Sequence, residues 1–533
     1  MKLATRASGS IMAVIPDPHI AGSDPPFGSH RRRLDKYERC PAHRAASEVD
    51  QMPVVSHSID RRVLAHRRNY DTILKRYSTE GDGLKEIGHG DSYPPYNISR
   101  LRMIRFVLLI AATAALRAQV AFSTDVWPVI ERRCVSCHQP GEVAPMPLTS
   151  YAEVRPWAQA IREAVLTGKM PPWQASGQTA HNFRNDRSLT EAEVRTLVTW
   201  VKEGAPEGEP LKTTFHPAVR EGGWKLGKPD IVIRVPGFQV PATGQMTYRY
   251  LITGGLFPKD VWVRAAEFRI DKRTVVHHIN AYARGPESSY LAGYPKGEVV
   301  TATIADRGRR REGEKVFDRR QQLIGWEPGY EPMPWLPGGA KQIRAGSDIV
   351  FEMHFSPNGK QVTDYSQLGL YLADGPPAER VVAIDTLRDL DLAIPAGDQD
   401  YVSRASMTLA QPVKLVSVQP HMHYRGKAME VRVVYPDGRA DLLISVPKYD
   451  FNWQTTYVLR EPILLPAATR LDSVAEFDNS ANNPANPDAS KLVNWGDQTT
   501  DEMHIAFLEL ALPVEAEPDK LFAAPPRMIG PKK

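Results

Sequence analysis

Residues 428–446 read Ala-Met-Glu-Val-Arg-Val-Val-Tyr-Pro-Asp-Gly-Arg-Ala-Asp-Leu-Leu-Ile-Ser-Val, and this stretch decides the fold class. Two apolar runs of strand length flank Pro436-Asp437-Gly438, a sequence that is typical of a β-hairpin turn. Similar short apolar runs, separated by turn residues and without a helical stretch among them, recur from Pro229 onward. The pattern predicts antiparallel β-sandwiches, and the length of this part of the chain suits two of them.

The two predicted sandwiches cover residues 225–378 and 379–515, and a tail follows at 516–533. Within the first, residues 306–339 combine the basic run Arg309-Arg310-Arg311 with many Pro, Gly and Trp, which predicts an exposed functional loop. The predicted strands are 230–235, 248–253, 261–270, 275–283, 348–354, 368–372, 414–419, 428–435, 442–446 and 505–512.

The chain has 533 residues, of which 42% are hydrophobic and 24% are charged. This composition is typical of globular proteins and excludes a disordered chain, a collagen-like chain and a polytopic membrane protein. The formal net charge of +5 lies within residues 1–102, which hold 17 Lys and Arg against 12 Asp and Glu. Because the remainder is balanced, we expect no nucleic-acid partner.

The N-terminal part has the pattern of a targeting region. Residues 1–102 have no sustained helix or strand period, and we expect either an over-extended start or a disordered arm. Residues 103–118 combine a basic start with an apolar run, as a secretory signal does. That run is shorter than the roughly 20 apolar residues of a membrane span. We expect a periplasmic or secreted protein, anchored in a membrane only if the signal stays uncleaved.

Two of the three cysteines follow the signal, and they stand in Cys134-Val135-Ser136-Cys137-His138. This is the attachment motif of c-type haem, in which the two thiols bind the porphyrin and the histidine ligates iron. A redox dithiol and half of a zinc site are the alternatives. The histidine directly after Cys137 disfavours the dithiol, and the lack of a second cysteine pair disfavours zinc. We therefore expect covalently bound haem c.

Residues 119–209 are predicted to form a small all-α domain around this motif. Ser150-Tyr151-Ala152-Glu153 and Thr190-Glu191-Ala192-Glu193 each have the form of a capping box that opens a helix. Between these helices, Met170-Pro171-Pro172 resembles the loop that carries the axial methionine in class I cytochromes c. The resemblance makes Met170 the expected sixth ligand of the iron, and Met146 is the alternative.

Five histidines fall in three strand contexts: His277-His278, His354 and His421-Met422-His423. On a strand, residues i and i+2 project to one face, so His421 and His423 suit a single metal ion. A lone strand histidine is usually a hydrogen-bonded polar group, and His354 by itself has no assigned role. Imidazole-rich ligation with a soft thioether nearby favours copper over zinc.

In order and spacing these residues resemble the copper type II, ascorbate-dependent monooxygenases, which include peptidylglycine alpha-hydroxylating and dopamine beta-monooxygenases. The family pattern is a His-His pair, a single His, a His-x-His and then Asp/Glu-Glu-Met before a final strand. Asp501-Glu502-Met503 completes that pattern, and the resemblance covers residues 225–513. It implies an electron-storing copper at His277, His278 and His354, and a catalytic copper at His421, His423 and Met503.

The resemblance also implies that the two coppers lie across an open cleft between the domains. Two positions depart from the peptide-amidating relatives. Gln419 stands where they carry an Arg that binds the substrate, and Phe507 stands where they carry Tyr. These departures argue against a peptidyl-glycine substrate. We expect hydroxylation of a C–H bond in a small substrate of unknown identity, with O2.

The chain as a whole suggests an exported haem- and copper-dependent monooxygenase with an external electron donor, either an ascorbate-like reductant or a redox protein. The alternative is a non-catalytic electron-transfer or copper-binding redox protein. A zinc-dependent hydrolase is disfavoured, because no His-Glu-x-x-His pattern occurs. The linker between Ala205 and Pro229 keeps the haem domain close to the first sandwich. We therefore predict that the haem supplies electrons to the first copper, and that the relay ends at the second.

Overall fold

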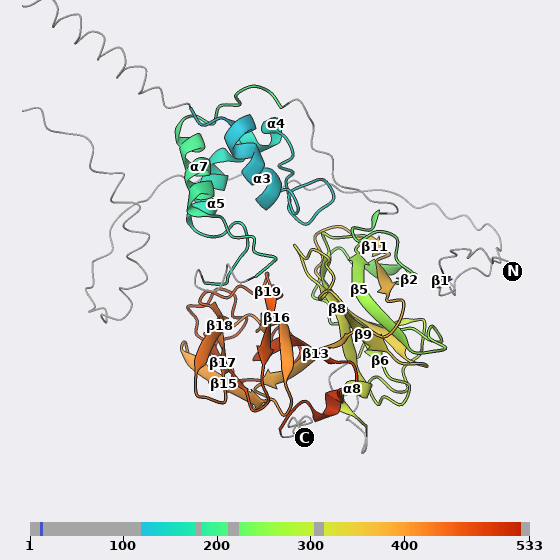
Figure 1. Cartoon of the computed structure of the whole chain (residues 1–533). Helices are drawn as coiled ribbons and strands as arrows, with labels where there is room; N and C mark the ends of the chain where they lie inside the picture. Colours follow the sequence, from blue (N-terminus) through green and yellow to red (C-terminus); the bar gives the residue numbers. More distant parts are fainter. Residues whose placement is uncertain (1–10, 14–118, 177–182, 212–222, 303–313, 524–533) are drawn as a thin grey trace, which may run out of the picture. The chain divides into compact units, whose positions relative to one another are not determined.

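The computed structural model describes residues 11–13, 119–176, 183–211, 223–302 and 314–523, all of them in one compact unit (Figure 1). The predicted signal at 103–118 and nearly all of 1–102 lie outside the described residues. In the described ranges no helix has the length and apolar character that crossing a membrane requires. Strands dominate, which confirms the mainly β class, and each predicted strand matches an observed one to within two residues at either end.

The first sandwich packs a five-stranded sheet against one half of a nine-stranded sheet. Phe351 of the first sheet meets Phe268 of the second, with ring centroids 6.2 Å apart, inside the buried core. The five-stranded sheet has the order β7 (Val299–Val300), β4 (Arg249–Ile252), β10 (Asp348–Phe355), β6 (Val276–Arg284), β8 (Gln321–Trp326). The half sheet has the order β1 (Ile11–Ala13), β2 (Ile231–Arg234), β12 (Gln367–Leu372), β5 (Val261–Arg269), β9 (Gly339–Ile343), and β3 (Phe238–Val240) pairs with β11 (Val362–Asp364).

The second sandwich packs the other half of the nine-stranded sheet against a four-stranded sheet around its own core (Figure 1). The hairpin turn lies where it was predicted, because Val434 pairs with Ala440 across it. The half sheet has the order β13 (Glu379–Arg388), β22 (Ile505–Pro513), β16 (Val413–His421), β19 (Tyr457–Leu465). The four-stranded sheet has the order β15 (Tyr401–Thr408), β20 (Arg470–Phe477), β17 (Gly426–Val434), β18 (Ala440–Val446), and β14 (Ala393–Ile394) pairs with β21 (Val493–Asn494).

The two sandwiches share one sheet, which the sequence did not predict. β13 pairs in parallel with β9 through Glu379–Gly339 and Arg380–Ala340. Next to this joint, the buried ammonium of Lys341 donates to the Glu509 carboxylate at 2.6 Å. A buried cation paired in this way resists separation, because either partner alone would be an uncompensated charge.

The region from 119 to 211 is helical and has a separate apolar core in which Phe122, Ile130, Leu197 and Trp200 are fully buried. The Thr190–Glu193 capping box forms in full, whereas Glu153 instead accepts from Thr149 and leaves its box half-made. The elements here are η1 (Phe122–Val126), α3 (Trp127–Arg133), α4 (Tyr151–Val154), η2 (Arg155–Trp157), α5 (Ala158–Leu166) and α7 (Glu191–Lys202), with α8 (Val316–Arg319) and η5 (Pro518–Lys520) elsewhere.

The interpretation of 306–339 as an exposed loop is wrong for its second half. Residues 321–326 form β8, which pairs with β6 inside the five-stranded sheet. Trp326 and Trp335 are buried against the core of the first sandwich. The Trp and apolar residues of this interval therefore fill the core. Arg309-Arg310-Arg311 lies outside the described residues.

Candidate metal centres

Three imidazoles converge at one end of the five-stranded sheet. His277 and His278 lie near the start of β6, and His354 lies near the end of β10, directly across from His278 in the strand register. The ring centroids are 5.1 to 5.3 Å apart in all three pairs. One nitrogen from each ring lies within 4.8 Å of the others, and among the described residues this is the only group of three or more His, Cys, Asp or Glu side chains so arranged. The antiparallel register therefore assembles the first histidine group.

The chemistry of the first histidine group fits a metal ion. Nδ1 of His277 and Nδ1 of His278 are 3.1 Å apart, a spacing that two nitrogens can reach when each is about 2.1 Å from one ion. Nδ1 of His354 is buried and has no hydrogen-bond partner among the described residues. Burial lowers the pKa of all three rings, to about 4 for His277, so they are neutral at pH 7 and can donate lone pairs.

The second group comes from the neighbouring sandwich. His421 ends β16, His423 follows two residues later, and their ring centroids are 5.3 Å apart at an interplanar angle of 81°. Met422 between them is fully buried in the core, so the two imidazoles lie on the other side of the backbone from it. Burial lowers the pKa of His421 to about 4, and it also lowers the pKa of His423 well below the ordinary value of a histidine. Met503, just before β22, lines the same cavity as His421.

Glu502 holds the second group together through the backbone. Its side chain is fully buried and accepts hydrogen bonds from the amides of His423 at 2.7 Å, Arg425 at 2.7 Å and Met503 at 3.0 Å. Burial raises its pKa to about 7 in spite of these donors. The sequence pattern included Glu502, but not this role. The Glu502 carboxylate therefore fixes the backbone at His423 relative to the backbone at Met503.

One cavity of about 230 Å³ is lined by members of both groups, including His278, His421 and Met503. Phe507 also lines it and packs edge to face on His421, with centroids 5.6 Å apart. The two sandwiches share this cavity. Its other lining residues are mostly polar or charged: Tyr248, Asn280, Tyr282, Arg320, Glu327, Glu352, Asp385, Arg388, Gln419, Gln454 and Asp497.

The predicted haem motif lies directly after α3. Cys134 and Cys137 are both unpaired thiols, and burial raises the pKa of Cys134 to about 12. A redox dithiol needs a lowered pKa, so this environment disfavours that alternative. Nδ1 of His138 lies 3.1 Å from the carbonyl oxygen of Met146, which orients the ring and leaves Nε2 for a metal. Met170 follows α5 and its side chain is half-buried.

The haem motif contacts the first sandwich. Arg273, four residues before His277, donates to Glu142 at 2.9 Å, and both side chains are largely buried. Gly329 approaches from the segment between β8 and β9. A Cβ atom added to it would lie 3.5 Å from Sγ of Cys137. The segment with Cys137 and Glu142 is therefore packed against the residues that lead into the first histidine group.

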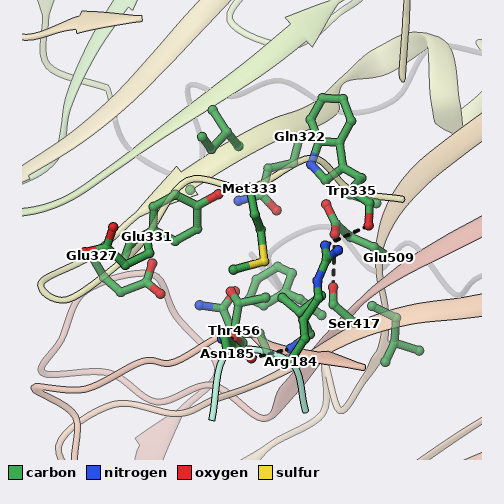
Figure 2. A pocket seen from close by; sticks show the side chains of 18 of the residues that line it. Arg184, Asn185, Gln322, Glu327, Glu331, Met333, Trp335, Ser417, Thr456 and Glu509 are labelled. Carbon is green, nitrogen blue, oxygen red and sulfur yellow. Dashed lines mark hydrogen bonds between the residues drawn. The ribbon is translucent and has the colours of Figure 1, made fainter. Parts of the chain in front are cut away.

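A second cavity, of about 80 Å³, lies where the helical region meets both sandwiches (Figure 2). Arg184 donates to the carbonyl oxygens of Pro334 at 2.6 Å and Trp335 at 2.8 Å. Asn185 donates to the carbonyl oxygen of Thr456 at 2.7 Å, from the second sandwich. The Met333 side chain extends into the cavity (Figure 2). Segment 183–185 thus links the helical region to both sandwiches.

His504 has a structural role. It is fully buried, and its two ring nitrogens bond to the hydroxyls of Ser403 at 2.7 Å and Ser473 at 2.8 Å. Both nitrogens are thereby occupied, so His504 does not join the second group although it follows Met503 directly.

Comparisons with known proteins identify no family for the chain. No family model matches it, and no curated protein matches it either. Solved structures that resemble it include the VP2 subviral particle of infectious bursal disease virus, with 10% identity and a TM-score of 0.17 over 51% of this chain and 57% of that one. Allantoicase from Saccharomyces cerevisiae has 9% identity and a TM-score of 0.15 over 51% and 80%. Likenesses this weak carry no argument about function.

Proposed function

We propose that the protein is an exported copper-dependent monooxygenase that hydroxylates a C–H bond of a small substrate. The convergence of His277, His278 and His354 next to a cavity that also takes in His421 and Met503 carries this proposal. Copper bound at these residues would supply one-electron transfer and the activation of dioxygen. The reaction balances as substrate, O2, two electrons and two protons giving hydroxylated product and water, with the electrons taken singly from an external donor.

The two groups differ in the ligands they offer. The first has three imidazoles, which suits an ion that accepts and passes on single electrons. The second combines His421 and His423 with the thioether of Met503, a soft ligand that favours the reduced cuprous state. Dioxygen reacts with a reduced metal, so we assign the hydroxylation to the second group. Glu502 contributes by fixing the backbone that presents two of its three ligands.

The shared cavity suits a small polar substrate. Its volume of about 230 Å³ is below the several hundred cubic ångströms that drug-sized ligands occupy. Arg320 and Arg388 both lie beside Asp385, at 3.8 Å and 2.7 Å, and all three line the cavity. A polar substrate can hydrogen-bond to such groups, whereas a hydrocarbon would displace their water without replacing its hydrogen bonds.

We further propose that a c-type haem at Cys134, Cys137 and His138, with Met170 as the second axial ligand, supplies electrons to the first group. A histidine–methionine haem has a high potential and exchanges single electrons readily. The ion pair between Glu142 and Arg273 supports this direction, because it holds the haem motif beside the strand that begins at Val276.

Turnover with labelled oxygen tests the proposal. The copper-loaded protein, with ascorbate as donor, is incubated under 18O2 with a panel of small polar amines, alcohols and amides. We expect one product to gain a single 18O atom, and His421→Ala to abolish the gain. If the wild type consumes no more oxygen than His421→Ala with any of the compounds, an enzymatic role is contradicted. The alternative of a non-catalytic electron carrier would then stand.

A further inference from the structure

Phe451 lies between the two histidine groups. Its ring stacks on His277 with centroids 5.2 Å apart and an interplanar angle of 18°. The same ring meets His423 edge to face, with centroids 6.1 Å apart and an angle of 86°. His277 belongs to the first sandwich and His423 to the second. Among the described residues no other aromatic ring contacts a histidine of both groups.

The loop that carries Phe451, residues 447–456 between β18 and β19, is fixed from the second group. The carbonyl oxygen of Gln454 accepts from the side chain of Gln419 at 2.6 Å. The side chain of Gln454 also hydrogen-bonds to His421. Tyr424, next to His423, packs edge to face on Phe451 with centroids 4.8 Å apart. The ring therefore has a defined place against the second group.

The helical region fixes the same loop from outside. Gln174 donates to the carbonyl oxygen of Asp450 at 3.2 Å, and Asn185 donates to that of Thr456 at 2.7 Å. These bonds hold the residue just before Phe451 and the last residue of the loop. Arg184, next to Asn185, is bonded to the first sandwich. One short segment of the helical region thus restrains both the Phe451 loop and the sandwich that carries His277.

Backbone pairing alone does not fix the distance between the groups. Among the described residues, strand pairing between the two sandwiches is confined to the two residue pairs of the β9–β13 ladder, with adjoining backbone bonds to the carbonyl oxygen of Gly338. That ladder lies at the start of β13, whereas His421 pairs with Ile505 near the opposite end of this sheet half, where Arg388 ends β13. Phe451 contacts a histidine of each group, so it can fix their separation at the end of the sheet that the β9–β13 ladder does not reach.

We propose that Phe451 sets the separation of the two histidine groups and so positions the two copper ions for electron transfer. This inference rests on the proposed function, because it assumes that both groups bind copper. With copper bound at both groups, the first group would give up one electron in each transfer and the second would accept it. Phe451 is a positioning residue, since a phenyl ring offers no ligand atom and undergoes no redox change here.

Pulsed electron paramagnetic resonance on the protein loaded with two Cu(II) ions tests this role without turnover. The dipolar coupling reports the distance between the ions. We expect one narrow distance in the wild type and in Phe451→Tyr, which keeps the ring. Phe451→Ala should lose the narrow distance and give a broad distribution shifted to longer values. Phe507→Ala is the matched control. Phe507 also packs on a histidine, His421, but that histidine belongs to the second group, so we expect the narrow distance to stay unchanged.

Copper content and thermal unfolding are measured on every variant. If Phe451→Ala does not fold, Phe451→Leu replaces it, since leucine keeps apolar volume but cannot stack. A Phe451→Ala or Phe451→Leu protein with two coppers and the narrow wild-type distance would overturn the inference and leave the proposed function standing. A wild type that binds fewer than two coppers would instead overturn the proposed function, and this inference with it.

Discussion

Arg273 donates a hydrogen bond to Glu142 at 2.9 Å, and this ion pair joins the segment that follows the haem motif to the turn that leads into β6. The side chains are only 19% and 16% exposed, so solvent and salt screen the pair less than they screen a surface pair. A single substitution can break this contact, so it offers a direct test of the proposed electron transfer from the haem.

Charge reversal at this contact should slow the relay. In Glu142→Arg two cations face each other, and we expect haem reoxidation by dioxygen to slow by roughly tenfold, the equivalent of about 1.4 kcal/mol. Stopped-flow absorbance of the fully reduced protein follows that step. The double variant Glu142→Arg with Arg273→Glu restores opposite charges and should recover most of the rate. A single variant as fast as the wild type would show that the pair does not position the haem.

Loss of the Met503 thioether should affect one group alone. Met503→Ile keeps a similar side-chain volume, so the free energy of unfolding should change by less than about 1.5 kcal/mol. We expect Cu(I) affinity at the second group to fall by roughly tenfold or more, which corresponds to at least about 1.4 kcal/mol. Competition with a Cu(I) chelator measures both sites. His354→Ala should instead lower Cu(I) affinity at the first group and leave the second unchanged. Equal losses of affinity at both groups in either variant would contradict the assignment of these ligands to separate sites.

Removal of the Glu502 charge should destabilise the second group more than the first. Glu502→Gln keeps the shape but presents an amide nitrogen to backbone donors, so at least one N–H loses its acceptor. We expect a loss of unfolding free energy of roughly 1–3 kcal/mol for a buried donor left unpaired. Thermal unfolding and copper stoichiometry give the two readouts. A variant that keeps two tightly bound coppers would exclude the bracing role of this carboxylate.

Glu327 should make stability fall as pH rises. Burial raises its pKa to about 8, although Arg187 and a hydrogen bond at Thr456 oppose this. Between the unfolded value near 4.5 and about 8, the folded state holds a proton that the unfolded state has lost. Its contribution to stability is therefore fully present below pH 4.5 and declines toward pH 8, by about 1.4 kcal/mol per pH unit for one proton.

Glu327→Gln cannot ionise and should flatten that decline when urea unfolding is measured from pH 5 to pH 8. Glu331→Gln is the matched control, because Glu331 is 41% exposed and pairs with Lys225 at 2.6 Å. An identical slope in Glu327→Gln and the wild type would show that Glu327 is ionised when folded.

The sequence predicted ten of the strands and missed others. β15 and β20 were not predicted, because Arg404, Asp472 and Glu476 break their runs, although these positions alternate with buried ones. Spacing along one strand predicted only that His421 and His423 lie together. The expectation that His354 lies beside His277 and His278 came from the family resemblance, because the pairing of β10 with β6 has no local signal. The roles of Phe451 and Glu502 depend on contacts between distant segments, and no local pattern encodes such contacts. The shared β9–β13 sheet was missed for the same reason.

The haem assignment has a simple genetic test. Cys134→Ala with Cys137→Ala removes both thiols that follow the predicted signal. We expect no haem to remain attached through denaturing electrophoresis, because thioether bonds are the only covalent link. Haem staining of the double variant at the wild-type level would disprove the assignment.

Metal and haem analysis of the purified protein tests the central claim most directly. Elemental analysis combined with a pyridine-haemochrome spectrum counts copper, zinc, iron and haem c per chain. We predict two copper ions and one covalently bound haem, one copper in His354→Ala, and a first-group copper retained in Met503→Ile. A protein that binds zinc in place of copper, or that holds no metal at His277, His278 and His354, would contradict the account.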